Sequence, residues 1–261
     1  MPLSSSPRRV FASLLLLSAL GLSSCSALGT LPVGADGAAT DPAASSTKAT
    51  TSTKAATPTA SAPASIGGQL TVSAALAKIP TKGRAPKTGY VRTEVFGAAW
   101  KDVDKNGCDT RNDILTRDLK GVTYKPGTRD CVVLTGTLAE PYTGTTINFV
   151  RGQGTSQAVQ IDHVVALSDA WQKGAQKLSQ TQREALANDP LNLLAVDGPS
   201  NSRKSDGDAA TWLPPKKSYR CAYVARQAAV KLKYGLWMTQ GEKDAITRVI
   251  ASCPTQTLPS A

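Results

Sequence analysis

The amino-acid sequence predicts an α+β domain, stapled by disulfides, over residues 67–261. Runs of β-branched and aromatic residues alternate there with stretches of helical periodicity, which favours short strands combined with several helices. Four cysteines fall within the same range. The range is long enough to bury one hydrophobic core, and no internal repeat divides it.

Residues 1–25 have the pattern of an export signal. Arg8 and Arg9 precede an apolar run that is shorter than the roughly 20 residues that span a membrane. The following Leu22-Ser23-Ser24-Cys25 resembles the lipobox of bacterial lipoproteins. That resemblance implies a two-chain lipid on the sulfur of Cys25, which anchors the exported protein on the outer face of a bacterial membrane. The alternative is a plain secretory signal, with the mature protein secreted.

The composition of residues 26–66 predicts a disordered tether. The segment consists almost entirely of Ala, Ser, Thr, Pro and Gly and contains no aromatic side chain. It buries too little apolar surface to offset its ordering entropy, so we expect it to give the domain reach from its anchor.

The chain is strongly basic, with a formal net charge of +11. Removal of Arg8 and Arg9 with the signal leaves 28 basic residues against 19 acidic ones, a net charge of +9. A basic exported domain is expected to meet polyanions such as nucleic acid or anionic envelope polymers. Charge alone does not choose between these, and no protein partner is predicted.

The cysteines of the domain are Cys108, Cys131, Cys221 and Cys253. An even number in an oxidising compartment predicts two disulfides. Of the three connectivities we favour Cys108 with Cys131 and Cys221 with Cys253, because each pair brackets one compact segment. A zinc site is the rival interpretation, but no two cysteines have the spacing of a zinc knuckle.

The expected elements follow from periodicity and turn signals. A short element lies within 89–100, and Asn112 or Asp113 is expected to cap a helix that continues to Leu119. Turn regions are expected at 125–128, 136–144 and 198–199, and a capping box at Thr181 and Glu184. The strands are expected within 121–136, 145–150, 158–167 and 191–196, and the helices at 168–177, 181–188, 219–234 and 242–252.

The stretch from Asp102 to Asp113 contains D-x-D-x-N-G, the first half of a calcium loop. Asp102, Asp104 and Asn106 are the candidate Ca²⁺ ligands. The twelfth position is Asp113, where such a loop has a bidentate Glu, so a polar turn that precedes a helix is the stronger interpretation.

His163 is the only histidine, and it follows Asp162 in a β-branched run. A lone histidine in an exported domain is usually structural, so its neighbours must decide its role. Side chains of adjacent strand residues point to opposite faces. Asp162 and His163 therefore share a site only if the strand ends, bulges or bends at this pair.

The order of elements around His163 is a strand with Asp-His, a strand with Asn, a turn, and a helix with Asn and Lys. A ββα-metal nuclease site requires this order. The chain resembles the HNH (His-Me finger) endonuclease superfamily, and in particular exported actinobacterial members that share a nuclease domain with the C-terminal part of GmrSD-type restriction enzymes. The resemblance covers most of residues 85–240 and is carried by Gly107-Cys108-Asp109-Thr110-Arg111-Asn112, Pro141-Tyr142-Thr143-Gly144, Ile161-Asp162-His163-Val164-Val165-Ala166-Leu167, Ala187-Asn188-Asp189-Pro190-Leu191-Asn192-Leu193 and Trp212-Leu213-Pro214-Pro215.

The resemblance implies a role for each of four residues. Asp162 and Asn201 are metal ligands, His163 is the general base, and Asn192 orients His163, with Asn188 as a nearby competitor for that last role. A neutral histidine can take a proton from water at working pH. Two oxygen ligands suit Mg²⁺, with Mn²⁺ as its replacement, better than zinc.

Three basic residues are candidates for holding the scissile phosphate. Lys204 shares a helical face with Asn201 at a spacing of three residues, and Arg203 lies beside it. Arg111 is suggested by the resemblance alone.

The prediction is thus a metal-dependent endonuclease that cleaves DNA, or RNA, with little sequence specificity. The alternative is a non-catalytic lipoprotein that binds DNA or an anionic polymer through its basic surface. A nucleotide-cofactor enzyme and a serine hydrolase are disfavoured, because the sequence has no G-x-G-x-x-G, Walker A or G-x-S-x-G motif.

Overall fold

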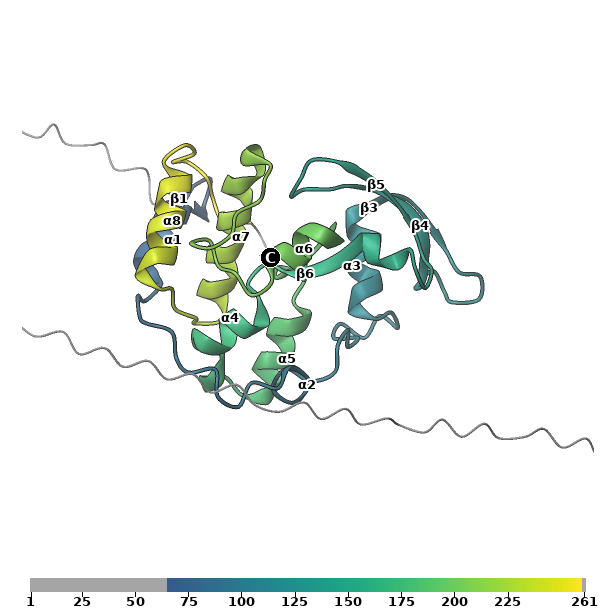
Figure 1. The fold of residues 1–261 in the computed structure, drawn as a ribbon, viewed down its shortest axis with the longest axis horizontal. Helices are drawn as coiled ribbons and strands as arrows, with labels where there is room; N and C mark the ends of the chain where they lie inside the picture. The colour runs from purple at the N-terminus through teal and green to yellow at the C-terminus, as the bar shows by residue number, and fades with distance from the viewer. Residues whose placement is uncertain (1–64, 260–261) are drawn as a thin grey trace, which may run out of the picture. The chain divides into compact units, whose positions relative to one another are not determined.

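The structure, a computed structural model, describes residues 65–259 (Figure 1). The predicted signal peptide, the lipidation site Cys25 and nearly all of the predicted tether lie outside the described residues. The elements are β1 (Ser65–Ile66), β2 (Gln69–Leu70), α1 (Val72–Lys78), α2 (Arg92–Val95), α3 (Thr110–Asp118), β3 (Leu119–Tyr124), β4 (Val133–Ala139), β5 (Thr146–Val150), β6 (Val159–His163), α4 (Leu167–Gln172), α5 (Gln180–Asn188), β7 (Leu193–Asp197), α6 (Gly198–Lys204), α7 (Arg220–Lys233) and α8 (Gln240–Ile250), with short 3₁₀ turns at Ser156–Ala158, Ala175–Lys177 and Lys217–Tyr219.

The antiparallel pair β6 and β7 is a two-stranded ribbon between two hydrophobic cores. Side chains of a strand alternate between its faces. Leu193 and Ala195 of β7 accordingly pack into one core, and Leu194 and Val196 pack into the other. The ribbon is buried on both faces, which explains why the strand of the sequence is a continuous apolar run.

The first of these cores lies beneath the three-stranded antiparallel sheet β3-β4-β5. Helix α3 contributes Ile114 and Leu115, and the sheet contributes Val133, Leu138 and Phe149. The Cys108–Cys131 disulfide joins the segment before α3 to the segment before β4. The sheet, α3 and this disulfide thus form one side of the domain.

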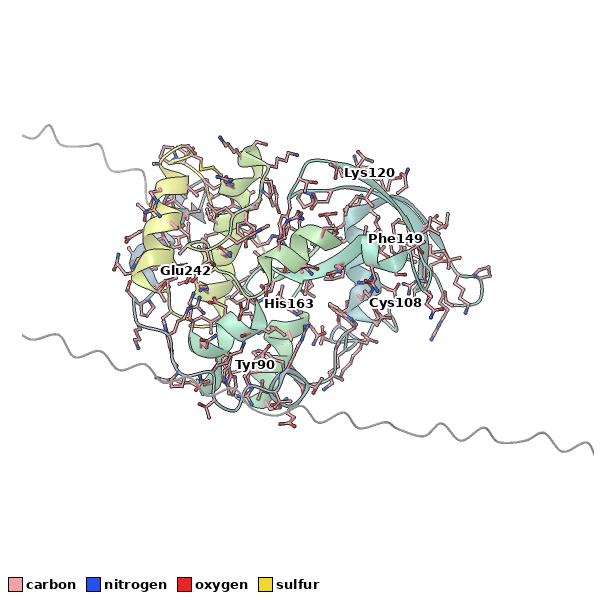
Figure 2. The ribbon with its side chains drawn as sticks, viewed as in Figure 1. Tyr90, Cys108, Lys120, Phe149, His163 and Glu242 are labelled. Atoms are coloured by element: carbon pink, nitrogen blue, oxygen red, sulfur yellow. A yellow bond between two sulfur atoms is a disulfide. The ribbon has the colours of Figure 1, made fainter. Side chains whose placement is uncertain are left out.

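The second core is formed by α1, α7 and α8, which contact one another. The Cys221–Cys253 disulfide ties the start of α7 to the end of α8. In the view of Figure 2, His163 lies near the centre, with Glu242 of α8 on one side and Phe149 of β5 on the other. Both predicted disulfide pairings are confirmed.

A network of buried charges connects this helical side to the rest of the domain. The ammonium of Lys173 lies 2.6 Å from carboxylate oxygens of both Asp208 and Glu242 and 2.7 Å from Asp169. Arg84 bonds Asp169 and Asp208 at 2.9 Å each. Buried charges are tolerated when they are paired in this way, so the network fixes the segment after α1 against α4 and α8.

The predicted elements occur, with corrections at their ends. Asp109 caps α3, since its carboxylate accepts a hydrogen bond from the Asn112 N–H, so the prediction of Asn112 or Asp113 as the cap was wrong. The capping box of α5 is formed by Ser179 and Gln182 instead of Thr181 and Glu184. In both cases the sequence contains two overlapping polar patterns, and only packing decides which one is used.

Three further boundaries differ from prediction. Strand β4 continues to Ala139, within the region expected to be a turn. The helix expected at 168–177 ends at Gln172, because Gly174 has a φ of 125° that no α-helix contains. Gly198 and Pro199 are not a turn but the first residues of α6, which Asp197 caps.

Among residues 65–259, no helix combines the length and the apolar character needed to cross a membrane.

The start of α6 requires a glycine for steric reasons. A Cβ atom at Gly198 would lie 2.2 Å from the main-chain oxygen of Gln157. Gly198→Ala is expected to destabilise the domain by about 1–3 kcal/mol, the usual effect of overpacking, as measured by urea unfolding. Gly154→Ala is the matched control, because a Cβ there meets nothing within 4 Å. Equal free energies of unfolding for the two variants would contradict the steric requirement for glycine at position 198.

Candidate active site

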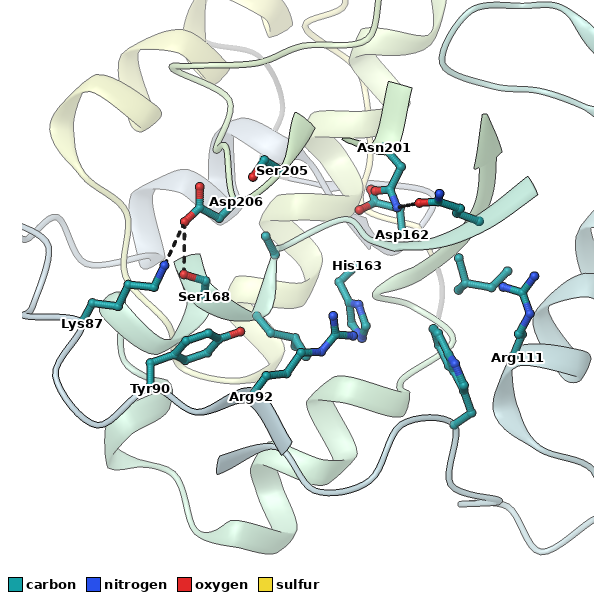
Figure 3. Close-up of a pocket in the computed structure, with 15 residues that line it drawn as sticks. Lys87, Tyr90, Arg92, Arg111, Asp162, His163, Ser168, Asn201, Ser205 and Asp206 are labelled. Carbon is teal, nitrogen blue, oxygen red and sulfur yellow. Dashed lines mark hydrogen bonds and ion pairs between the residues drawn. The ribbon is translucent and has the colours of Figure 1, made fainter. Parts of the chain in front are cut away.

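A pocket of about 510 Å³ opens at the end of β6 (Figure 3). Three parts of the chain form it: the segment before α3 with the first turn of α3, the end of β6 with the start of α4, and the end of α6 with the residues after it. The lining residues include Lys87, Tyr90, Arg92, Trp100, Arg111, Gln160, Asp162, His163, Ser168, Asn201 and Asp206. The structure thus gathers Asp162, His163, Asn201 and Arg111 around one cavity.

The ending of β6 lets Asp162 and His163 face the same cavity. The strand ends at His163, and the chain bends at Val164 and Val165 before α4 begins. Of the three alternatives expected for this pair, the strand end is the one that occurs: Asp162 and His163 still pair in regular register with Leu194 and Leu193, and the bend comes after them. Both side chains are buried, with 4% and 8% of their surface exposed, respectively.

The His163 ring is held by a main-chain carbonyl. Its Nε2 lies 2.8 Å from the Ala187 oxygen. A carbonyl only accepts hydrogen bonds, so Nε2 carries the proton and Nδ1 has a free lone pair. Burial, followed by the positive charge of Arg92, lowers the pKa of His163 from 6.5 to about 4. The imidazole is therefore neutral at pH 7 and has a basic nitrogen.

Trp100 forms a wall beside this imidazole. The two rings are nearly parallel, with an interplanar angle of 16° and centroids 6.0 Å apart. Trp100 has a φ of 60°, which is unfavourable for a bulky residue. Backbone strain of this kind is concentrated at functional sites, where the surrounding structure maintains it.

Asp162 is surrounded by donors. Its Oδ1 accepts a hydrogen bond from the Lys204 ammonium at 2.9 Å, and its Oδ2 accepts one from the Tyr142 hydroxyl at 2.5 Å. Lys204 also donates to the main-chain oxygen of His163 at 2.9 Å. Lys204 compensates the buried charge of Asp162 and fixes the end of β6 against α6.

Asn201 projects from α6 beside Asp162, as Figure 3 shows. Its Nδ2 donates to Gln160 Oε1 at 2.8 Å, which leaves its Oδ1 as the amide atom available to a cation. Asp162 and Asn201 thus present two oxygen donors side by side at the pocket, which Gln160 and Asp206 also line. Within residues 65–259, no cluster of three or more His, Cys, Asp or Glu side chains is arranged to hold a metal ion.

Two of the predicted phosphate-binding residues lie outside this pocket. Lys204 is buried against Asp162, and the exposed Arg203 donates to the Ser200 hydroxyl at 3.0 Å. Both line an adjacent hollow, together with Arg84, Lys87 and Trp212. Arg111 does line the pocket, and its guanidinium donates to the Val159 oxygen at 3.2 Å.

Asn192 stabilises the bend after His163 and does not bond the ring. Its side-chain Oδ1 accepts from the Val165 N–H at 2.8 Å, and its Nδ2 donates to the oxygens of Val165 and Leu186. Its main-chain oxygen accepts from the Val164 N–H at 2.8 Å. The competitor Asn188 donates to the Glu184 oxygen. The ring is oriented instead by Ala187, which no side-chain pattern could reveal.

The calcium prediction at Asp102, Asp104 and Asn106 stays untested. The carboxylates of Asp102 and Asp104 accept hydrogen bonds from the main-chain N–H groups of Asn106 and Gly107. These bonds form a polar turn that leads into Asp109, the cap of α3.

Comparison with known proteins bears directly on this site. Residues 109–249 match the family described as GmrSD restriction endonucleases, C-terminal domain. The chain belongs to this family. It is also 33% identical over 185 residues to an uncharacterized secreted protein of Arthroderma benhamiae, an alignment that covers 70% of this chain and 85% of that protein. No solved structure matches the chain.

Membership of the GmrSD C-terminal domain family indicates a nuclease that acts on nucleic acid. The matched region contains Asp162, His163 and Asn201 but begins after Arg92 and Trp100.

Arg92, Trp100 and Tyr142 were not predicted as site residues. Tyr142 lies in one of the five segments of the resemblance, whereas Arg92 and Trp100 have no motif around them.

The single histidine permits a direct test of the site's electrostatics. The Hε1 proton of His163 is expected to titrate by NMR with a midpoint near pH 4, because burial and Arg92 disfavour the imidazolium. The neutral form should persist on raising the pH from 5 to 8. A midpoint near 6.5 in the folded protein would show that His163 is neither buried nor close to the charge of Arg92.

The buried pair of Lys204 and Asp162 also predicts a stability effect. Lys204→Met leaves a buried carboxylate without its cation, which is expected to reduce the free energy of unfolding by about 3 kcal/mol in urea titrations at pH 7. Arg203→Met is the matched control, since Arg203 is exposed and its loss should change stability by less than about 0.5 kcal/mol. Similar losses in both variants would refute the role of Lys204.

Proposed function

We propose that this GmrSD C-terminal domain is an exported HNH-type endonuclease that hydrolyses phosphodiester bonds of DNA, with RNA as the alternative substrate. One observation carries the proposal. A neutral imidazole with a free Nδ1 lies in a pocket beside two oxygen donors, Asp162 and Asn201.

The order of the elements supports an HNH core. Strands β6 and β7 pair antiparallel, and α6 follows β7 directly and contacts both strands. Helices α4 and α5 are inserted between the two strands. We propose that β6, β7 and α6 are the ββα-metal core and that the insertion supplies Ala187, the residue that orients His163.

His163 acts as the general base in this proposal. Nδ1 takes a proton from a water molecule whose oxygen forms a bond to phosphorus. The bond between phosphorus and the 3′ oxygen breaks, and that oxygen leaves with a proton from solvent. The products are a 5′-phosphate and a 3′-hydroxyl, and His163 returns its proton to solvent.

The donor set fits a divalent ion that is held by few protein ligands. Tyr142 and Lys204 use two of the roughly four acceptor positions of the Asp162 carboxylate, so lone pairs remain for a cation. Asp162 and Asn201 would hold the ion, and Mg²⁺ retains most of its waters in such sites, with Mn²⁺ as a substitute. When bound, the ion supplies Lewis-acid stabilisation of the leaving oxygen.

Substrate recognition is proposed to be electrostatic. Arg111 lies in the pocket, and Arg203 lies in the adjacent hollow with Lys87 and Arg84. This arrangement suits contacts to phosphates along a strand, which carry no sequence information. Lys204 is assigned to the support of Asp162 instead of to phosphate binding.

Export is supported by the two disulfides, which form in oxidising compartments, and by the secreted relative. Anchoring through a lipid on Cys25 is proposed from the lipobox resemblance alone. The competing function, a non-catalytic lipoprotein that binds an anionic polymer, rests on the same basic charge.

Plasmid cleavage tests the proposal. The purified domain is expected to nick and linearise plasmid with Mg²⁺ or Mn²⁺ and to be inactive in EDTA. His163→Ala should lower the rate by at least about 10²-fold, the usual contribution of general base catalysis, while DNA still shifts on a native gel. Arg248→Ala, an exposed residue of α8, is the control and should cleave at the wild-type rate.

Two outcomes would reject the nuclease. If the wild type shifts plasmid but leaves it intact with both metals, the binding function is favoured. If His163→Ala cleaves as fast as the wild type, His163 is not the base.

A further inference from the structure

The segment of residues 84–101 is an arm that packs against α4 and α5. Ala85 N–H donates to the Gln172 oxygen at 2.8 Å, and the Val95 oxygen accepts from the Arg183 guanidinium at 2.6 Å. Phe96 is 1% exposed and packs in one cluster with Leu167 and Leu186. The arm is therefore fixed at its start and again at Val95 and Phe96.

The arm carries its polar side chains into the pocket. Lys87, Arg92 and Trp100 all line the cavity that contains His163. In Figure 3 the guanidinium of Arg92 points toward the His163 ring. The influence of Arg92 on the pKa of His163 agrees with this placement.

Most charged groups of the pocket already have partners. Asp162 is paired with Lys204, and Lys87 lies 3.5 Å from Asp206. Arg111 donates to the Val159 oxygen. Within residues 65–259, the Arg92 side chain is the one cation of this pocket that has no ion pair or hydrogen bond.

We propose that Arg92 is a substrate-binding residue of the pocket and holds the scissile phosphate beside His163. A guanidinium binds two phosphate oxygens with its planar fork, and an arginine without a protein partner is available for that contact. A phosphate between the two groups also separates Arg92 from the imidazolium that forms when His163 takes a proton. The catalytic pocket is thus completed by an arm that precedes the family-matched residues 109–249.

The assignment to the scissile phosphate rests on the proposed nuclease function, whereas phosphate binding by Arg92 can be measured without cleavage. The probe is a short DNA oligonucleotide in EDTA, followed by the NMR signal of the single histidine. Wild type and the control Arg248→Ala are expected to show a saturable shift of the His163 signal. Arg92→Ala should require at least about tenfold more oligonucleotide, a loss typical of one charge-assisted contact.

The kinetic test uses plasmid and Mg²⁺. Arg92→Ala should lower kcat by about 10²-fold, as expected for loss of a group that stabilises developing charge. Arg92→Lys should be intermediate, since lysine restores the charge without the bidentate geometry. Thermal unfolding midpoints should be unchanged, because Arg92 is exposed and unpaired.

The outcomes separate the two proposals. If the wild type fails to cleave but Arg92→Ala still weakens the oligonucleotide shift, the nuclease proposal fails and phosphate binding by Arg92 stands. If Arg92→Ala binds the oligonucleotide and cleaves as the wild type does, the inference is overturned. The inference is also overturned if Arg92→Ala lowers the unfolding midpoint, Arg92→Lys has the wild-type midpoint, and both variants bind the oligonucleotide as the wild type does. That result would show a structural role for Arg92.

Discussion

The geometry of the site depends on one buried charge, the carboxylate of Asp162. A carboxylate with 4% exposure must be compensated, and here Lys204 of α6 and Tyr142 of the β4–β5 connection provide the donors. These three residues come from three separate parts of the chain. The bond between Lys204 and Asp162 fixes α6 against the end of β6. It thereby places Asn201, on the same helix, beside Asp162.

The orientation of the His163 imidazole depends on a different constraint, the hydrogen bonding of main-chain groups where β6 ends. The bend after His163 exposes N–H groups that Asn192 satisfies, and the Ala187 oxygen accepts a hydrogen bond from the ring Nε2–H. Buried polar groups must be bonded, and the bond from Nε2–H to Ala187 leaves Nδ1 as the ring nitrogen with a free lone pair. The contacts that stabilise this bend therefore also determine which ring nitrogen of His163 can accept a proton.

Local patterns identified most of the elements, and together with the family resemblance they identified four residues that line the pocket, Asp162, His163, Asn201 and Arg111, the last from the resemblance alone. A unique histidine after an aspartate, and an Asn-x-x-Lys spacing after an apolar strand, required no knowledge of tertiary structure. The roles of residues that contact partners distant in sequence could not be predicted from local patterns. Lys204 looked like a phosphate ligand because nothing near it in sequence indicates that its ammonium is buried against Asp162. Arg92 reaches the pocket only because Phe96, Ala85 and Val95 fix the arm elsewhere.

The positions of the disulfides have a consequence for how the domain withstands stress outside the cell. Neither bridge encloses any residue between Val159 and Lys204: one lies before this segment and the other after it. The covalent links reinforce the two cores that hold the β6–β7 ribbon, and the segment that carries the candidate site is held by noncovalent contacts. Reduction of the disulfides would therefore act on the site only indirectly, through the two cores that pack against the β6–β7 ribbon.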